Sequence, residues 1–155
     1  PMNPTDVAIG EITWSLIRGG LYSAGFIVVM FAMGLSPSVT GILALPAALL
    51  AGFAFGAVGM AATTYMRSWQ DFDLITLAIM PMFLFSGTFY PIEIYPAWLQ
   101  VVARFSPLYQ ATDLIRSMTF GIFDASLIVH VLYLVIMAAV GMSIAMRRMS
   151  KLLLT

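Results

Sequence analysis

Long apolar runs dominate this chain, and their length limits the folds that are open to it. Runs at about 14–34, 42–66 and 125–146 each hold the ~20 residues that a helix needs to cross a hydrocarbon core. A shorter run at about 72–88 contains Pro81. Hydrophobic residues make up 61% of the sequence and charged residues 9%, against roughly 25% charged in a soluble domain. We therefore predict an all-α membrane protein with four transmembrane helices at these positions.

The placement of basic residues predicts the orientation of these helices, because arginine and lysine gather on the cytoplasmic side of a membrane. If both termini are cytoplasmic, the outer side holds only Arg104 and Arg116. Trp14 and Trp69 then fall at the inner interface and Trp98 at the outer one, where aromatic residues are enriched. We therefore predict cytoplasmic N and C termini. The basic residues that this orientation places inside are Arg18, Arg67, Arg147, Arg148 and Lys151.

Glycine and proline interrupt the apolar pattern after the third run. Gly87 can end a helix in the left-handed conformation, and Pro91 hinders its continuation. Pro96 suits the start of a new helix, and Ser106-Pro107 is typical of an N-cap followed by the first residue of another. Each helix would be ~15 Å long, too short to cross a membrane. We predict a short helix pair at about 96–119.

The residues of this pair leave two interpretations open. Apolar side chains recur on one face of each predicted helix, which suits either an ordinary amphipathic outer loop or a re-entrant pair that dips into the membrane and returns. Asp113 precedes Arg116 by about one turn, so we predict a structural ion pair between them.

Four motifs in this region occur in an order and spacing that resemble the signature region of ABC exporter permeases of the type-2 family. The resemblance is strongest to the branch that exports lipo-oligosaccharides, nodulation factors and daunorubicin-like drugs. Upstream, Gly10-Glu11-Ile12-x-Trp14 resembles the entry into the third helix of that family. The four motifs are Phe85-Ser86-Gly87-Thr88-Phe89-Tyr90-Pro91, Pro96-x-Trp98-Leu99, Ser106-Pro107-Leu108 and Asp113-Leu114-Ile115-Arg116.

The resemblance implies how the chain is organised. Permeases of this family usually have six transmembrane helices, so residues 1–155 are expected to form a single permease domain that corresponds to the C-terminal part of such a protein. The resemblance also implies a bacterial cytoplasmic membrane, contact with membrane lipids, and a second permease subunit, identical or related, that completes the pore.

A separate ATPase subunit is a further implication of the resemblance. That subunit would bind ATP and magnesium, and this chain would hold no cofactor or metal. The sequence agrees, because it contains no Gly-x-x-x-x-Gly-Lys-Ser/Thr phosphate loop. Residues 1–13 would be the cytoplasmic coupling segment, with a short coupling helix around Asp6–Glu11. The residues expected at the ATPase contact are Asp6, Val7, Gly10, Glu11 and Trp14.

The segment 89–124 would then be the outer gate of the path of a hydrophobic, lipid-linked or drug-like substrate. The residues expected at this gate and along the path are Ser86, Gly87, Phe89, Tyr90, Pro91, Trp98, Pro107 and Leu108.

Other functions stay open beside this one. A membrane enzyme acting on lipid or glycan would draw its acid and base groups from Glu93, Asp113, Asp124 and His130, although no nucleophile and base are visible together. A non-transporting scaffold would have no need of a re-entrant pair. We expect His130 to make a structural hydrogen bond rather than to relay protons. The net charge of +0 argues against a nucleic-acid partner.

Overall fold

The computed structural model describes residues 4–35 and 39–153, and over these ranges its regular structure is entirely helical. The chain forms α1 (Pro4–Ala32), η1 (Val39–Leu43), α2 (Ala44–Thr63), α3 (Asp71–Leu84), η2 (Ile92–Ile94), α4 (Ala97–Phe105), α5 (Pro107–Phe120) and α6 (Ser126–Leu153).

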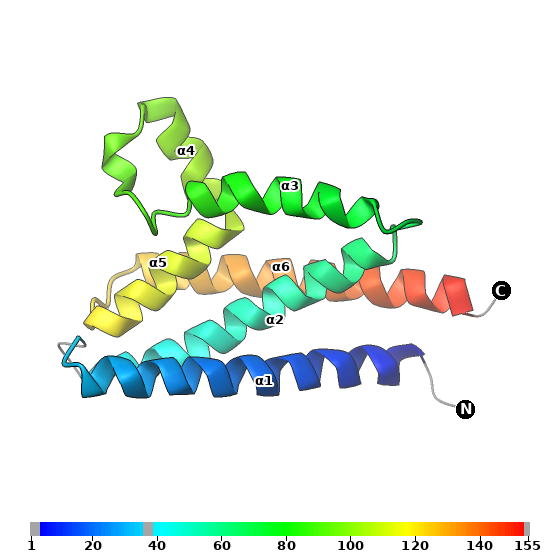
Figure 1. Cartoon of the computed structure of the whole chain (residues 1–155), viewed down its shortest axis with the longest axis horizontal. Helices are drawn as coiled ribbons and strands as arrows, with labels where there is room; N and C mark the ends of the chain where they lie inside the picture. The colour runs from blue at the N-terminus through cyan, green and yellow to red at the C-terminus, as the bar shows by residue number, and fades with distance from the viewer. Residues whose placement is uncertain (1–3, 36–38, 154–155) are drawn as a thin grey trace.

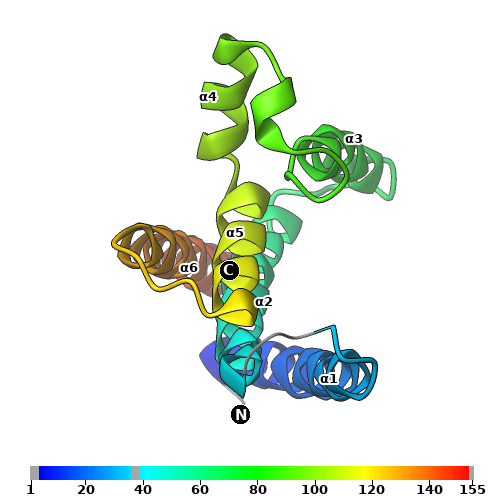
Figure 2. The same ribbon diagram turned by 90° about the vertical axis from the view of Figure 1, so that its left-hand side faces the viewer.

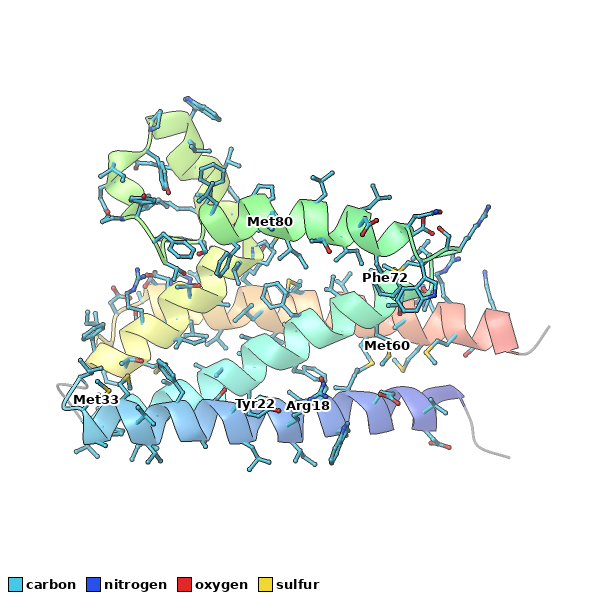
Figure 3. All side chains as sticks on the ribbon, in the orientation of Figure 1. Arg18, Tyr22, Met33, Met60, Phe72 and Met80 are labelled. Carbon is cyan, nitrogen blue, oxygen red and sulfur yellow. The ribbon has the colours of Figure 1, made fainter. Side chains whose placement is uncertain are left out.

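The long helices run side by side (Figure 1). α1 begins and α6 ends at one end of the molecule, which we call the terminal end. The turn after α1 and the helices α4 and α5 lie toward the other end, which we call the hairpin end. Figure 3 places Met60 and Phe72 toward the terminal end and Met33 at the hairpin end.

Three segments of the described chain are long and apolar enough to cross a membrane: Ile9–Ala32, Val39–Thr63 and Ser126–Lys151. They match three of the four predicted transmembrane helices, so the prediction of an all-helical membrane protein is confirmed. The fourth differs, because α3 has 14 residues and a length of ~21 Å, short of a ~30 Å core. This helix stops at Leu84, before the left-handed Gly87 (φ 74°).

α1 is a single continuous helix of 29 residues, so the predicted coupling segment and the first predicted span follow each other in one helix. Residues 1–3 of the predicted coupling segment lie outside the described ranges. Asp6–Glu11 is no separate short helix, because the described part of α1 contains no proline after Pro4 and Val7 and Ile9 extend its apolar run. Arg18 consequently lies near the middle of α1 (Figure 3).

α2 occupies the centre of the molecule, between α1 and α6 and beside α5 (Figure 2). Its buried side chains are all alanines at helical spacing, and small side chains let helices approach closely in an apolar environment. Leu114 of α5 and Leu134 of α6 are fully buried in the core against this face. The buried residues of α2 are Ala44, Ala47, Ala51, Ala54, Ala57 and Ala61.

Gly141 marks the closest approach between α2 and α6. A Cβ atom at this position would lie 2.8 Å from two backbone atoms, the carbonyl carbon of Ala57 and the nitrogen of Val58. Backbone atoms cannot move aside as a flexible side chain can. The packing of α6 against the alanines of α2 therefore depends on glycine here.

α3 lies apart from α1, α2 and α6 (Figure 2), and none of its residues is buried. Asp71 fixes its start by accepting hydrogen bonds from the amides of Arg67 (2.7 Å) and Ser68 (3.0 Å). The bond from Arg67 and then that from Ser68 lower the pKa of the Asp71 carboxyl below 3.8. Since the folded-state pKa is lowered, this contribution to stability is present at neutral pH and is lost on acidification through that pKa.

Replacing Gly141 with alanine is expected to destabilise the fold by about 1–3 kcal/mol, because the added methyl group overpacks the contact with α2. The measurement is unfolding in detergent micelles titrated with dodecyl sulfate. Gly59→Ala is the matched control, since a Cβ at Gly59 meets nothing within 4 Å. Equal stability of the two variants would contradict the close contact.

Candidate functional site

α4 and α5 form a helix pair that we call the hairpin, residues 97–120. From the hairpin end, α4 runs toward the middle of the molecule and α5 returns (Figure 1). α4 begins directly after Pro96, and Pro107 is the first residue of α5, as predicted. Ser106 occupies the N-cap position of α5 with an extended backbone, but its side chain makes no capping hydrogen bond. The proline ring at the first helical position therefore fixes the turn without that bond.

Two backbone carbonyls at the end of α4 are bound by side chains from other helices. Gln110 of α5 donates its Nε2 to the carbonyl of Arg104 at 2.7 Å. Tyr133 of α6 donates its hydroxyl to the carbonyl of Phe105 at 2.8 Å. The last carbonyls of a helix have no partner within that helix, and an apolar surrounding supplies no water for them. These two side chains therefore satisfy the end of α4.

The segment between α3 and α4 is held in the same way. Arg116 of α5 donates its Nη2 to the carbonyl of Gly87 at 2.7 Å, across 29 residues of sequence. Gln100 of α4 donates its Nε2 to the carbonyl of Tyr95 at 2.9 Å. The ring of Tyr109 would lie 3.3 Å from a Cβ at Gly87, so a side chain there would meet both backbone strain and this ring.

Ser86 is the most enclosed of the predicted gate residues, with 1% of its surface exposed. Its hydroxyl donates to the carbonyl of Phe83 at 2.8 Å and lies 2.8 Å from the hydroxyl of Thr88. Ser86 and Gly87 thus form a compact buried turn that links α3 to the hairpin. The Ser-Gly-Thr part of the motif consequently has a structural explanation in local hydrogen bonding and close packing.

The other predicted gate residues do not join this buried turn. Pro107 and Leu108 are half-buried at the start of α5. The exposed members are Phe89, Tyr90, Pro91 and Trp98. Along α4 the apolar face of Trp98, Val101, Val102 and Phe105 points away from the rest of the chain, with Trp98 69% exposed. The hairpin therefore combines a polar, internally bonded side with an apolar outer side.

The predicted ion pair between Asp113 and Arg116 is replaced by two longer-range contacts. Arg116 binds the carbonyl of Gly87, and Asp113 Oδ2 lies 3.1 Å from Nε2 of His130 on α6. At ~100° per residue the two side chains point about 60° apart around α5, so each meets a different neighbour. Nδ1 of His130 contacts Oε1 of Gln110, which agrees with the predicted structural hydrogen bond of this histidine.

Gln100, Tyr109, Gln110 and Tyr133 are site residues that the sequence reasoning missed. Each is a polar or aromatic side chain in an amphipathic or apolar helix, and such residues are usual at an interface. They bind backbone carbonyls or pack against a glycine. These partners lie far along the chain or across a turn, so local periodicity cannot predict the contacts. The one available signal was the pair of helix breaks, which create carbonyls in need of donors.

The four acid and base residues of the enzyme interpretation do not gather at one place. Glu93 and Asp124 are exposed, and Asp124 accepts hydrogen bonds from the hydroxyl and amide of Ser126. The hydroxyl and then the amide lower the pKa of the Asp124 carboxyl below 3.8. His130 and Asp113 do meet, but the other side chain in hydrogen-bond contact with them is the amide Gln110, which is no nucleophile. Over the described residues no group of three potential metal ligands occurs.

The predicted coupling residues lie on one face of α1. At ~100° per residue they fall within about 140° around the helix. Trp14, at 62% exposed, is on this face, whereas Ile12 on the opposite side is buried against the bundle. The exposed residues on this face are Asp6, Val7, Gly10, Glu11 and Trp14.

An open apolar groove of about 440 Å³ lies where α1, α2 and α5 meet. Tyr22, Phe26 and Met30 of α1 form one wall, and Ile115 and Thr119 of α5 contribute to the other. The label of Tyr22 in Figure 3 marks the α1 side of this groove. Its lining offers contact to hydrocarbon and three hydroxyl groups, those of Tyr22, Ser23 and Thr119, and it provides no formal charge.

The described chain has three apolar segments long enough to cross a membrane, so it is a multi-pass membrane protein. The sequence profile of the family described as "ABC-2 type transporter" matches residues 1–120. The chain therefore belongs to the ABC-2 type transporter membrane family. No solved structure matches it significantly.

Similar curated proteins carry the name Nodulation protein J. That of Rhizobium leguminosarum bv. trifolii is 36% identical over 117 residues, which cover 75% of this chain and 45% of the relative. That of Rhizobium leguminosarum bv. viciae is 30% identical over 151 residues, covering 94% and 58%. That of Rhizobium meliloti (strain 1021) is 34% identical over 127 residues, covering 81% and 47%. The chain thus spans about half the length of these relatives.

Replacing Arg116 with alanine is expected to loosen the segment between α3 and α4. The Gly87 carbonyl loses a donor that is charged, and such a bond contributes about 1.5–3 kcal/mol. Amide hydrogen exchange across residues 85–95 should therefore become faster, while that of α2 stays unchanged. Arg104→Ala is the control, because it removes the same charge from the neighbouring helix without removing a donor to Gly87. If exchange rises equally in both variants, the tether is not specific.

Proposed function

We propose that this chain is the permease subunit of an ATP-driven exporter that moves a hydrophobic, lipid-linked or drug-like substrate outward across the bacterial cytoplasmic membrane. In this proposal a separate subunit binds ATP and magnesium and docks on the exposed face of α1. A second permease subunit completes the path, and the hairpin acts as its outer gate.

The main support for this proposal is the structure of the hairpin. Its two helices have 9 and 14 residues, so neither is long enough to cross a membrane. Four of its connections end on backbone carbonyls, at Gly87, Tyr95, Arg104 and Phe105. A non-helical backbone is tolerated at membrane depth where protein groups bind it in this way. A simple anchor would gain nothing from such a segment.

The distribution of charge supports cytoplasmic termini. Arg67 follows α2 and Arg147, Arg148 and Lys151 close α6, so four basic residues lie toward the terminal end. The hairpin carries two, Arg104 and Arg116. Arginine and lysine are enriched in cytoplasmic segments, and this asymmetry therefore supports a cytoplasmic terminal end. In the same orientation α3 enters the membrane from the cytoplasmic side, and the turn at Ser86 and Gly87 continues it to the hairpin. Together with the three long spans, α3 would make four membrane segments.

The apolar surfaces support a lipid-like substrate and a membrane or permease neighbour. The groove between α1, α2 and α5 has the shape and lining to hold an acyl chain. α3 buries none of its residues within this chain, and residues 13–32 of α1 likewise include no buried residue. Lipid or the second permease subunit would cover these helices. The name of the relatives, Nodulation protein J, supports a link to nodulation and leaves the cargo open.

The coupling role is tested by reconstituting the permease with the ATPase subunit in lipid vesicles. The double variant Asp6→Asn, Glu11→Gln removes both carboxylates from the exposed face of α1. We expect several-fold weaker co-purification of the ATPase, or hydrolysis that no longer depends on transport. The measurement is ATP hydrolysis together with outward movement of a fluorescent lipid.

Glu93→Gln is the matched control, because it removes one exposed carboxylate at the hairpin end. This control should leave ATPase binding and hydrolysis unchanged. Unaltered assembly, hydrolysis and export in the double variant would overturn the coupling assignment. Lipid movement without ATP would overturn the ATP-driven exporter itself.

A further inference from the structure

His130 and Asp113 meet where the hairpin is seated on α6. Nε2 of His130 lies 3.1 Å from Oδ2 of Asp113, and Nδ1 contacts Oε1 of Gln110. His130 is 6% exposed, near the start of an apolar membrane span. A titratable pair in such a place is unusual, because an unpaired charge there is costly. Neither the proposed coupling face nor the groove uses it.

The orientation of Gln110 fixes one proton of the histidine ring. Its Nε2 donates to the carbonyl of Arg104 at 2.7 Å, so its oxygen faces the ring. The opposite orientation would set two oxygens against each other at the Arg104 carbonyl. Since an amide oxygen only accepts hydrogen bonds, Nδ1 of His130 must carry a proton. The ring thus donates toward α5 on this side.

The other side of the ring requires a second proton. A neutral ring that is protonated at Nδ1 presents a lone pair at Nε2. An ionised Asp113 would present lone pairs as well, and the two atoms are 3.1 Å apart. A proton between them removes this repulsion. The contact is a close ionic approach rather than a well-aligned hydrogen bond, because Nε2 has no partner of hydrogen-bond geometry.

We propose that Asp113 and His130 form a proton-binding site that locks the hairpin to α6. With the proton bound, the imidazolium donates to Gln110 and faces the Asp113 carboxylate, and the pair has no net charge. Release of the proton to water leaves a neutral ring beside a carboxylate and a net charge of −1 in an apolar setting. The site stands apart from the proposed export function, since it requires only the α5–α6 contact.

The charged and titratable side chains around this pair have partners of their own or are exposed, so Asp113 and His130 are the groups that can bind a proton at this contact. On α5, Arg116 is bound to Gly87, and Tyr109 packs against that glycine. From α4, Arg104 contributes its backbone carbonyl, and its side chain is exposed. Tyr133 of α6 is bound to the carbonyl of Phe105, and Asp124 is bound to Ser126.

The remaining helices in contact with α6 bring no charge to the pair. α2 packs against both α5 and α6 and carries no titratable side chain. α1 also contacts α6, but its charged residues Asp6, Glu11 and Arg18 lie in its first half, whereas α6 begins at the hairpin end (Figure 1). Proton binding at this contact therefore rests on Asp113 and His130 themselves.

Nuclear magnetic resonance of the protein in lipid nanodiscs tests the site directly, because His130 is the sole histidine of the chain. With ¹⁵N-labelled histidine and ¹³C-labelled aspartate, we expect at neutral pH protons on both ring nitrogens and an ionised Asp113. A proton on Nδ1 together with a protonated Asp113 carboxyl also supports the site. A ring protonated only at Nε2, or an ionised Asp113 beside a neutral ring, overturns it.

Asp113→Asn tests whether the protonation of His130 depends on the Asp113 carboxylate or on the surrounding fold in general. Its amide can donate to Nε2, so we expect loss of one ring proton and retention of that on Nδ1. Asp73→Asn is the control, because it removes a carboxylate in the first turn of α3, away from the contact between α5 and α6, and its spectrum should match the unaltered protein. Where the ring of the unaltered protein carries both protons, an unchanged histidine spectrum in Asp113→Asn overturns the proposal.

The lock itself is tested by the distance between spin labels on cysteines at Val102 of α4 and Ile136 of α6, both exposed. The bound proton stabilises the contact and is lost as the pH rises. The distance distribution should therefore broaden between neutral and alkaline pH in the otherwise unaltered chain and stay constant with Asp113→Asn. The same broadening in both proteins overturns the lock.

Discussion

The arrangement of the hairpin depends on one constraint: a helix that ends in an apolar environment leaves backbone carbonyls without partners. In this chain, side chains from neighbouring elements meet that need. Arg116 reaches the carbonyl of Gly87, and Tyr133 reaches that of Phe105. These bonds connect the end of α3, the hairpin and α6. The fold can therefore contain two helices that do not cross the membrane.

α5 is the element on which these connections meet. It packs its apolar side, including Leu114, into the core formed with α2 and α6. Its polar side holds Gln110, which binds a carbonyl at the end of α4, and Arg116, which binds a carbonyl before α4. A movement of the hairpin would break a few side-chain hydrogen bonds while the helices themselves stay intact. The alanine face of α2 against Gly141 would provide the rigid support for such a movement.

Local sequence rules predicted the breaks in this region and missed the contacts across it. Pro96, Pro107 and Gly87 act through their own backbone geometry, so the starts of α4 and α5 and the break after α3 followed from the sequence. The Asp113–Arg116 pair was predicted from spacing alone, and longer-range partners displaced it. Such partners depend on how α5 crosses α6, which periodicity does not encode. The family resemblance was confirmed, and the roles assigned to individual gate and coupling residues stay predictions.

In the proposed arrangement the hairpin enters the membrane from the outer side and returns, with the junction of α4 and α5 as its deepest point. Depth can be measured by spin labels on single cysteines at Ile94, Phe105 and Phe123, which are exposed in a chain without native cysteine. We expect the label at Phe105 to collide most often with oxygen and least often with a water-soluble nickel chelate. Equal or shallower depth at Phe105 than at Ile94 and Phe123 would contradict it.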